Sequence, residues 1–225
     1  MNLWQSYLNL YASLPDRCEK SLGLISEPVD SLSSIVFFIS AFFIYKLLKN
    51  NNIQDQRIKL LVILVVLIGI GSTTYHSFHS PYTAIFDLLP IYIFVFYSLY
   101  LLAAFISESK ILQYGIPLLL FIFQLGFRFA SIPLFILGMP TFHIFNIIFI
   151  LGLSFWLYSR IGKVIVSIFP VLFSYSLGVL ARYFDLIVCP INGVGTHFIW
   201  HICVAFATYY TAKFFVKLLS VKSGL

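Results

Sequence analysis

The sequence predicts an all-α integral membrane protein built as a bundle of seven transmembrane helices. The first observation is composition: 60% of the 225 residues are hydrophobic, 10% are charged, and the mean hydropathy is +0.98, values far from those of soluble domains. The second is that the charges divide the chain into long uncharged intervals. The third is that its three cysteines include no Cys-x-x-Cys pair, which excludes a disulfide-rich scaffold and a zinc ribbon.

The uncharged intervals define the predicted spans, because a helix that crosses a hydrocarbon core of about 30 Å needs about 20 residues. The predicted spans cover residues 31–48, 60–79, 84–106, 111–127, 140–158, 164–184 and 195–218. Pro133, Gly138 and Pro140 interrupt a long apolar stretch, so we expect a loop there. Residues 31–220 therefore form the membrane domain, and residues 221–225 form a cytoplasmic tail.

Residues 1–30 are expected to form an extracytoplasmic segment. Five apolar or aromatic residues recur there at helical spacing: Trp4, Tyr7, Leu8, Tyr11 and Leu14. This pattern favours a short helix lying in the membrane interface, and a frayed polar tail is the alternative.

The distribution of Lys and Arg predicts the orientation, because cytoplasmic loops carry the excess of positive charge. With the N-terminus outside, only Arg17, Lys20, Arg128 and Arg182 of the fourteen basic residues lie on the outer side. We therefore expect an outer N-terminus and a cytoplasmic C-terminus. The host is a bacterial cytoplasmic membrane, or a membrane of the endoplasmic reticulum or Golgi type in a eukaryote. Because the charges are scattered at segment ends, no nucleic-acid partner is expected.

Polar side chains inside membrane helices are costly, so each of them is a functional candidate. Ser72 and His76 lie four residues apart at the outer end of the second span, and His197 and His201 do so at the outer start of the seventh. Asp87 lies at the outer start of the third span. All five lie within about three helical turns of the same surface. We therefore expect them to converge.

Three imidazoles with a carboxylate and a hydroxyl are typical of a catalytic zinc centre, in which three nitrogens hold the ion and a fourth position is left for water. No Glu follows the first His of the late pair, so the candidate base is Asp87. Taken singly, the histidines could bind interfacial carbonyls, Asp87 could cap a helix and Ser72 could bond its own backbone. Their joint occurrence favours the zinc centre. His79 and His143 are expected to be interfacial or packing residues.

These residues carry a resemblance to a known family. The motifs Ser-x-x-x-His, Asp-x-Leu-Pro and a late His-x-x-x-His resemble those of the alkaline ceramidases, in the seven-helix CREST superfamily that also contains the progestin and adipoQ receptors. They are carried here by Ser72, His76, Asp87, Pro90, His197 and His201. The segment DRCEKSLGLISEPVDSLSS is similar to the family's amino-terminal stretch. The resemblance covers nearly the whole chain.

The resemblance implies a zinc-dependent amidase that cleaves ceramide to a sphingoid base and a fatty acid. Its zinc ligands would be His76, His197 and His201. Asp87 would act as general base or would merely orient a ligand, and the Ser72 hydroxyl would help to hold the oxyanion.

The resemblance also implies a calcium site near the N-terminus. Its ligands would be Asp16, the Arg17 carbonyl, Glu19, Ser21 and Glu27. Arg17 stands where the family usually has an aromatic residue, and Ser21 where it usually has Asn. The alternative is a solvated acidic cluster without an ion.

Two of the cysteines, Cys18 and Cys189, fall on the predicted outer side. We predict a disulfide between them, in agreement with the resemblance and with an oxidising compartment. Two free thiols are the alternative.

A site at the outer leaflet suits a membrane lipid, with ceramide as the substrate that the resemblance implies. Two other functions remain open. One is a seven-transmembrane lipid receptor or signalling protein with a structural zinc, and the other is a zinc hydrolase of another lipid amide or ester. No protein partner is inferred.

Overall fold

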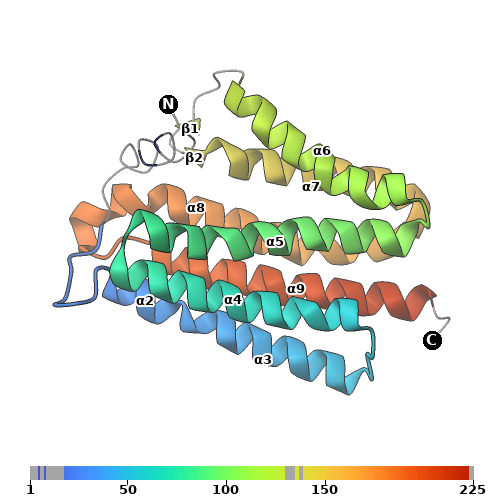
Figure 1. Ribbon diagram of the computed structural model, residues 1–225, viewed down its shortest axis with the longest axis horizontal. Helices are drawn as coiled ribbons and strands as arrows, with labels where there is room; N and C mark the ends of the chain where they lie inside the picture. Colours follow the sequence, from blue (N-terminus) through green and yellow to red (C-terminus); the bar gives the residue numbers. More distant parts are fainter. Residues whose placement is uncertain (1–4, 6–7, 9–17, 130–134, 137–138, 223–225) are drawn as a thin grey trace.

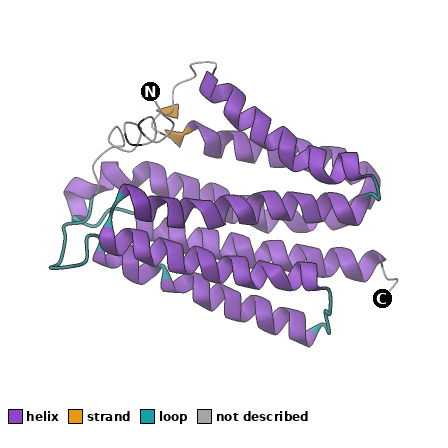
Figure 2. Ribbon diagram, in the orientation of Figure 1, coloured by secondary structure: helices purple, strands orange, loops and turns teal. Residues whose placement is uncertain are grey.

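The computed structural model describes residues 5, 8, 18–129, 135–136 and 139–222. Within these residues the chain is almost entirely helical, and the long helices run side by side (Figure 1; Figure 2). The α-helices are α2 (Pro28–Ser33), α3 (Ile35–Asn50), α4 (Gln56–Phe78), α5 (Pro81–Ile106), α6 (Lys110–Phe129), α7 (Thr141–Ile161), α8 (Phe169–Asn192) and α9 (His197–Lys222). A 3-10 helix, η1 (Gly162–Ile168), joins α7 to α8. The short strands β1 (Phe135–Ile136) and β2 (Met139–Pro140) pair antiparallel between α6 and α7.

The helices are those of an all-α, multi-pass membrane protein, as composition predicted. Five helical segments of the described residues are long and apolar enough to cross a membrane: Pro28–Asn50, Gln56–Phe78, Pro81–Ile106, His143–Asn192 and His197–Val221. The segment His143–Asn192 has 50 residues, more than twice the roughly 20 that one crossing needs, and it contains both α7 and α8. Many large apolar side chains face outward, such as Ile111 and Phe155, which are 84% and 86% exposed. Such a surface is suited to lipid.

Each predicted span overlaps one helix from α3 to α9, and the local sequence explains several of the boundaries. Asp55 begins α4 by accepting a hydrogen bond from the Arg57 amide at 2.9 Å. Ser80 begins α5 through a reciprocal capping box with Thr83. His79, in the left-handed conformation with φ of +41°, ends α4. The connection between α4 and α5 is therefore very short, and it holds the end of one helix beside the start of the next.

The helix that contains the predicted sixth span continues beyond residue 184. Helix α8 extends to Asn192 and ends at Gly193, which has φ of +70°. The charge of Asp185 suggested a loop, but the residues that follow it, LIVCPI, are apolar enough to continue the helix. Pro190 lies in the last turn of the helix. Cys189 therefore lies on α8 and not in a loop.

The core lies where α3, α4 and α9 meet. Helix α4 packs between α3 and α5, and α9 packs against both α3 and α8. Ile44, Leu61 and Phe215 are among the side chains buried in this seam. Helices α6 and α7 lie together along one side of the bundle (Figure 1). The predicted interfacial helix near the N-terminus lies outside the described residues, apart from Gln5 and Leu8, which are helical.

Candidate metal centre and adjoining cavity

Three histidines meet at one end of the bundle. His76 lies near the end of α4, whereas His197 and His201 lie in the first turns of α9. Their ring centroids are 5.1 Å apart for His76 and His197, 4.8 Å for His76 and His201, and 4.9 Å for His197 and His201. One ligating nitrogen of each lies within 4.8 Å of the others, and all three residues are buried. The convergence that the sequence predicted for these side chains is present.

The helix ends that carry the histidines lie at the same end of the bundle. Helix α4 ends there and α5 and α9 begin there, opposite the chain's C-terminus (Figure 1). The start of α9 is held by Asp185 of α8, whose Oδ1 accepts hydrogen bonds from the Thr196 and His197 amides at 2.7 and 2.8 Å. Gly195, with φ of +75°, is required beside it, because a Cβ there would collide with Asp185 Oδ1. Asp185 thus positions His197 through the backbone.

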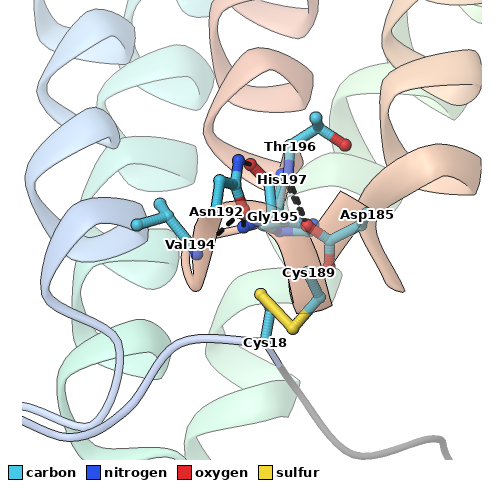
Figure 3. Close-up of a disulfide and its surroundings, with 8 residues drawn as sticks. All are labelled: Cys18, Asp185, Cys189, Asn192, Val194, Gly195, Thr196 and His197. Carbon is cyan, nitrogen blue, oxygen red and sulfur yellow. Dashed lines mark hydrogen bonds between the residues drawn. A yellow bond between two sulfur atoms is a disulfide. The ribbon is translucent and has the colours of Figure 1, made fainter. Parts of the chain in front are cut away.

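The predicted disulfide between Cys18 and Cys189 is present. Figure 3 shows it beside the turn that leads from α8 into α9. Within that turn, Asn192 Oδ1 accepts from the amides of Val194 and Gly195 at 3.1 and 2.7 Å. The bridge therefore fixes the amino-terminal segment against the turn that precedes His197. Cys203 of α9 is a buried free thiol.

Ser72 lies beside the histidines, one turn before His76. Its Oγ is 3.4 Å from His201 Nε2. Ser34 Oγ donates a hydrogen bond to it at 3.0 Å, and both serines are buried. The Ser72 hydroxyl therefore contacts side chains from other segments of the chain.

Asp87 lies on α5, close to the point where α5 and α4 make their tightest contact. A Cβ at Gly71 of α4 would collide with the Phe86 carbonyl oxygen and would lie 3.1 Å from the Asp87 Cα. This glycine lets the two backbones approach at the depth of Ser72. Asp87 and His197 border the same cavity, and Asp87 interacts electrostatically with Arg182 of α8.

The acidic residues of the amino-terminal segment have separate partners. Glu19 accepts hydrogen bonds from the Val29 and Asp30 amides at 2.7 and 2.8 Å, at the start of α2. Glu27 is buried, with Oε2 against His76 Nδ1 and Oε1 at 3.2 Å from His79 Nδ1. Ser21 is exposed, and Asp16 and Arg17 lie outside the described residues. The calcium site stays a prediction.

A cavity of about 430 Å³ extends from the histidines into the bundle, between α4, α5, α7, α8 and α9. Most of its wall is apolar. One side carries a polar cluster, in which Gln124 donates to Asn146 at 2.7 Å, and Tyr175 Oη lies 3.2 Å from Asn146 Nδ2 and 2.6 Å from His143 Nδ1. His143 packs edge-on against Trp200, which lies on α9 one residue before His201. The cavity therefore reaches the cluster of three histidines at His197.

The sequence did not predict several contacts at this site. Glu27, expected as a calcium ligand, lies against His76, and Asp185 holds the backbone amide of His197. His79, expected to be an interfacial or packing residue, stacks on Tyr75 at 5.3 Å and faces Glu27. Asp30 is buried within ligating distance of Glu27 and His76. These contacts join segments that lie far apart in the chain, so no local spacing signals them. The one hint in the sequence is that two acids, Glu27 and Asp30, stand next to an apolar span.

The chain matches no protein-family model and none of the curated proteins with which it was compared. Its functional interpretation therefore depends on the motifs and on the geometry of the site.

The donor set is suited to zinc. Three neutral imidazoles in a tetrahedral arrangement are ligands that this ion prefers, and a ligand set of this kind leaves one position for water. His76 Nδ1 faces Glu27, and His201 Nδ1 is 2.7 Å from Ser33 Oγ. The Nε2 atoms are thus the nitrogens that can ligate a shared ion.

Proposed function

We propose that this protein is an intramembrane zinc-dependent amidohydrolase that cleaves the amide bond of a ceramide-like lipid. The observation that carries the proposal is that three buried histidines from α4 and α9 meet beside a cavity that Asp87 also borders. A metal centre that opens into an apolar chamber supports a reaction on a lipid. The motif resemblance to the alkaline ceramidases supports the same reaction.

His76, His197 and His201 would hold the zinc ion. When bound there, zinc would lower the pKa of a water molecule to about 7 and would polarise the amide carbonyl. All three rings are buried, so the protein shields the proposed ligands from bulk water. Asp185 keeps His197 in place by holding the first amides of α9.

Asp87 would act as the proton carrier. Its carboxylate takes a proton from the attacking water and returns it to the departing amine, because an amide nitrogen leaves poorly unless it is protonated. The proximity of α4 and α5 at Gly71 supports this role, since it holds the Asp87 backbone at the depth of the histidines. Asp87 also interacts electrostatically with Arg182 of α8.

Ser72 would donate a hydrogen bond to the oxyanion that forms on the carbonyl oxygen. Ser34 Oγ lies 3.0 Å from Ser72 Oγ and 3.0 Å from the Asp30 carbonyl oxygen, and these contacts hold Ser72 beside the histidines. Its distance of 3.4 Å from His201 Nε2 keeps the hydroxyl close to where a reacting group would lie. Such a donor is typically worth about 10²- to 10³-fold in kcat.

The cavity supports an amphiphilic substrate. Its apolar wall suits a hydrocarbon chain, and the polar cluster around Asn146 and Tyr175 lies near Trp200 at the histidine end. Polar groups placed inside a membrane bundle are costly unless they bind something polar. A lipid amide with hydroxyl groups close to its carbonyl fits this distribution.

We also propose that all seven helices from α3 to α9 cross the membrane, with the metal centre at the extracytoplasmic end. The excess of Lys and Arg at the opposite end supports this orientation. Labelling with a membrane-impermeable maleimide tests it. Leu24→Cys, at a position 93% exposed, should react in intact cells or sealed vesicles, whereas Lys222→Cys should react only after permeabilisation. The reverse pattern would exclude this orientation.

The reaction is tested by measuring zinc content and hydrolysis of a fluorescent ceramide on purified protein in detergent. We expect about one zinc per chain and release of fatty acid by the wild type. His197→Ala should lose zinc, whereas Asp87→Asn should keep zinc and lose about 10²- to 10⁴-fold in kcat. Asp55→Asn is the matched control, because this carboxylate lies at the other end of α4.

The outcomes separate the functions considered. Zinc without hydrolysis of any lipid amide or ester would favour a receptor with a structural zinc. Hydrolysis of other lipids but not of ceramide would keep the mechanism and change the substrate. A wild type that binds no zinc would exclude the proposed centre.

A further inference from the structure

The short helix α2 contacts two of the three histidines through polar side chains. Glu27, the residue before α2, places Oε2 against Nδ1 of His76. Ser33, the last residue of α2, places Oγ 2.7 Å from Nδ1 of His201. In both rings the contacted nitrogen is Nδ1, so the opposite edge with Nε2 is the one that can ligate a metal shared with His197.

The contacts place a polar partner beside Nδ1 of both rings. Ser33 Oγ also donates to the Asp30 carbonyl oxygen at 2.9 Å, so the hydroxyl is held by its own helix beside His201. A carboxylate oxygen accepts hydrogen bonds, and Glu27 Oε2 lies against Nδ1 of His76. A ring whose Nδ1 has a partner presents its Nε2 edge to a shared metal.

The backbone holds Glu27 at this place. Its amide donates to the His76 carbonyl oxygen at 2.9 Å, and the Ser26 amide donates to the Ser77 carbonyl oxygen at 2.9 Å. Glu19 then holds the start of α2 through the Val29 and Asp30 amides. Glu27 is only 2% exposed, and a buried carboxylate is tolerated where hydrogen-bond donors surround it. His76 Nδ1 lies against Oε2 of Glu27, and His79 Nδ1 lies 3.2 Å from Oε1.

This arrangement differs from the one expected for a calcium ligand. The motif resemblance would bring Glu19 and Glu27 to one ion. In the structure, both oxygens of Glu19 accept backbone amides, and both oxygens of Glu27 face histidine nitrogens.

We infer that Glu27 and Ser33 are positioning residues of the zinc centre: they hold Nδ1 of His76 and of His201, and so orient the Nε2 edge of each ring toward the ion. Partners of this kind increase the basicity of the ligating nitrogen, and their loss typically weakens metal binding about 10- to 100-fold. The inference rests on the proposed function, because it assumes that the ion is bound by these histidines. It assigns to α2 a role that its sequence does not reveal.

The test measures zinc affinity directly, by competition with a chelating dye on purified protein in detergent with EGTA present to remove calcium. Glu27→Gln and Ser33→Ala should each weaken zinc binding about 10- to 100-fold. Ser33→Thr keeps the hydroxyl, so it should bind zinc with nearly the affinity of the wild type. The matched control is Ser31→Ala, because Ser31 is also on α2 but pairs with Ser77 Oγ at 2.8 Å and not with a zinc ligand.

A second readout is the visible absorption of the Co²⁺-substituted protein, which reports ligand geometry without turnover. We expect altered spectra for Glu27→Gln and Ser33→Ala, and a wild-type spectrum for Ser31→Ala. Unchanged zinc affinity with a lower unfolding temperature would mean that α2 only stabilises the fold, and would overturn the inference.

Calcium provides a further discriminating outcome. If Glu27→Gln abolishes a calcium-dependent rise in unfolding temperature while zinc affinity is unchanged, Glu27 is a calcium ligand and the inference is wrong. If the wild type itself binds no zinc, the proposed function fails together with the inference. If the wild type binds zinc and cleaves lipid, but Glu27→Gln and Ser33→Ala bind zinc as tightly as the wild type, the inference is wrong and the proposed function stands.

Discussion

Replacing Gly71 with alanine should separate α4 from α5 beside Asp87. An alanine Cβ at this position would lie 2.7 Å from the Phe86 carbonyl carbon and 3.1 Å from the Asp87 Cα. Non-bonded carbon atoms rest about 3.5–4.0 Å apart, so the two backbones must separate by about 1 Å. The atoms in the way belong to the backbone, and no side-chain rotation can relieve the contact.

This displacement should affect catalysis more than metal binding. The zinc ligands lie on α4 and α9, whereas the proposed base lies on α5. A shift of about 1 Å in a reacting group can cost about 10²-fold in rate, and overpacking of this kind costs roughly 1–3 kcal/mol of stability. Alanine is favoured over glycine in a helix by about 1 kcal/mol, so a net loss of stability would come from the collision.

The assay compares kcat on a fluorescent lipid amide, zinc content and unfolding temperature for Gly71→Ala and wild type. The matched control is Gly69→Ala on the same helix, whose Cβ would meet the Phe38 ring at 3.0 Å and the Phe37 Cβ at 3.1 Å. Both contacts are with α3 and neither is with α5, so we expect little change in kcat. If Gly71→Ala keeps its zinc and the wild-type kcat, the reaction does not depend on the position of α5, and Asp87 is not the base.

Asp185→Ala removes the carboxylate that caps α9 and should lower stability by about 0.5–2 kcal/mol. Asp185→Asn should lose less, because its amide oxygen can still accept; equal losses in thermal unfolding would contradict a capping role. Reduction of the Cys18–Cys189 bridge, which joins residues 171 positions apart, should lower the unfolding temperature but keep zinc bound, and zinc release would refute this expectation. Asn146→Leu should raise KM by up to about tenfold for a lipid amide with hydroxyl groups near its carbonyl. It should leave KM for a plain fatty amide unchanged, since an equal rise for both would indicate a packing defect.

Much of the fold could be predicted because lipid selects for features that are local in sequence. A crossing helix needs an apolar run of sufficient length, and the predicted spans each overlap one of the helices. Helix α8 extends beyond the predicted span, and this difference has a local cause as well. Asp185 ends an uncharged interval, but its carboxylate accepts amides from the start of α9, so the charge does not mark a loop.

The candidate histidines and Ser72 could be predicted for a related reason. A polar side chain in a membrane helix is costly wherever it lies, so its identity and approximate depth are visible without knowledge of its neighbours. The spacing of His197 and His201 places both on one face of α9. The pairing of Cys18 with Cys189 followed from their shared predicted side and from the family resemblance, and the structure confirms it.

The residues that orient the histidines could not be predicted in this way. Glu27 reaches His76 because α2 packs against the end of α4, and Ser33 reaches His201 across 168 positions of sequence. Acids near a membrane surface are common, and nothing local distinguishes one that faces water from one that faces a histidine.

The sequence by itself determined that this chain is an all-α membrane protein with three histidines, an aspartate and a serine at similar depth. Apolar length and the cost of burying polar groups act on each segment separately, so they can be read along the chain. Only the tertiary structure decided that the three rings share one centre, that a cavity adjoins it, and which nitrogen of His76 and His201 faces a partner. These features depend on how each helix is rotated and how closely it approaches its neighbours, and side-chain packing between distant segments determines both.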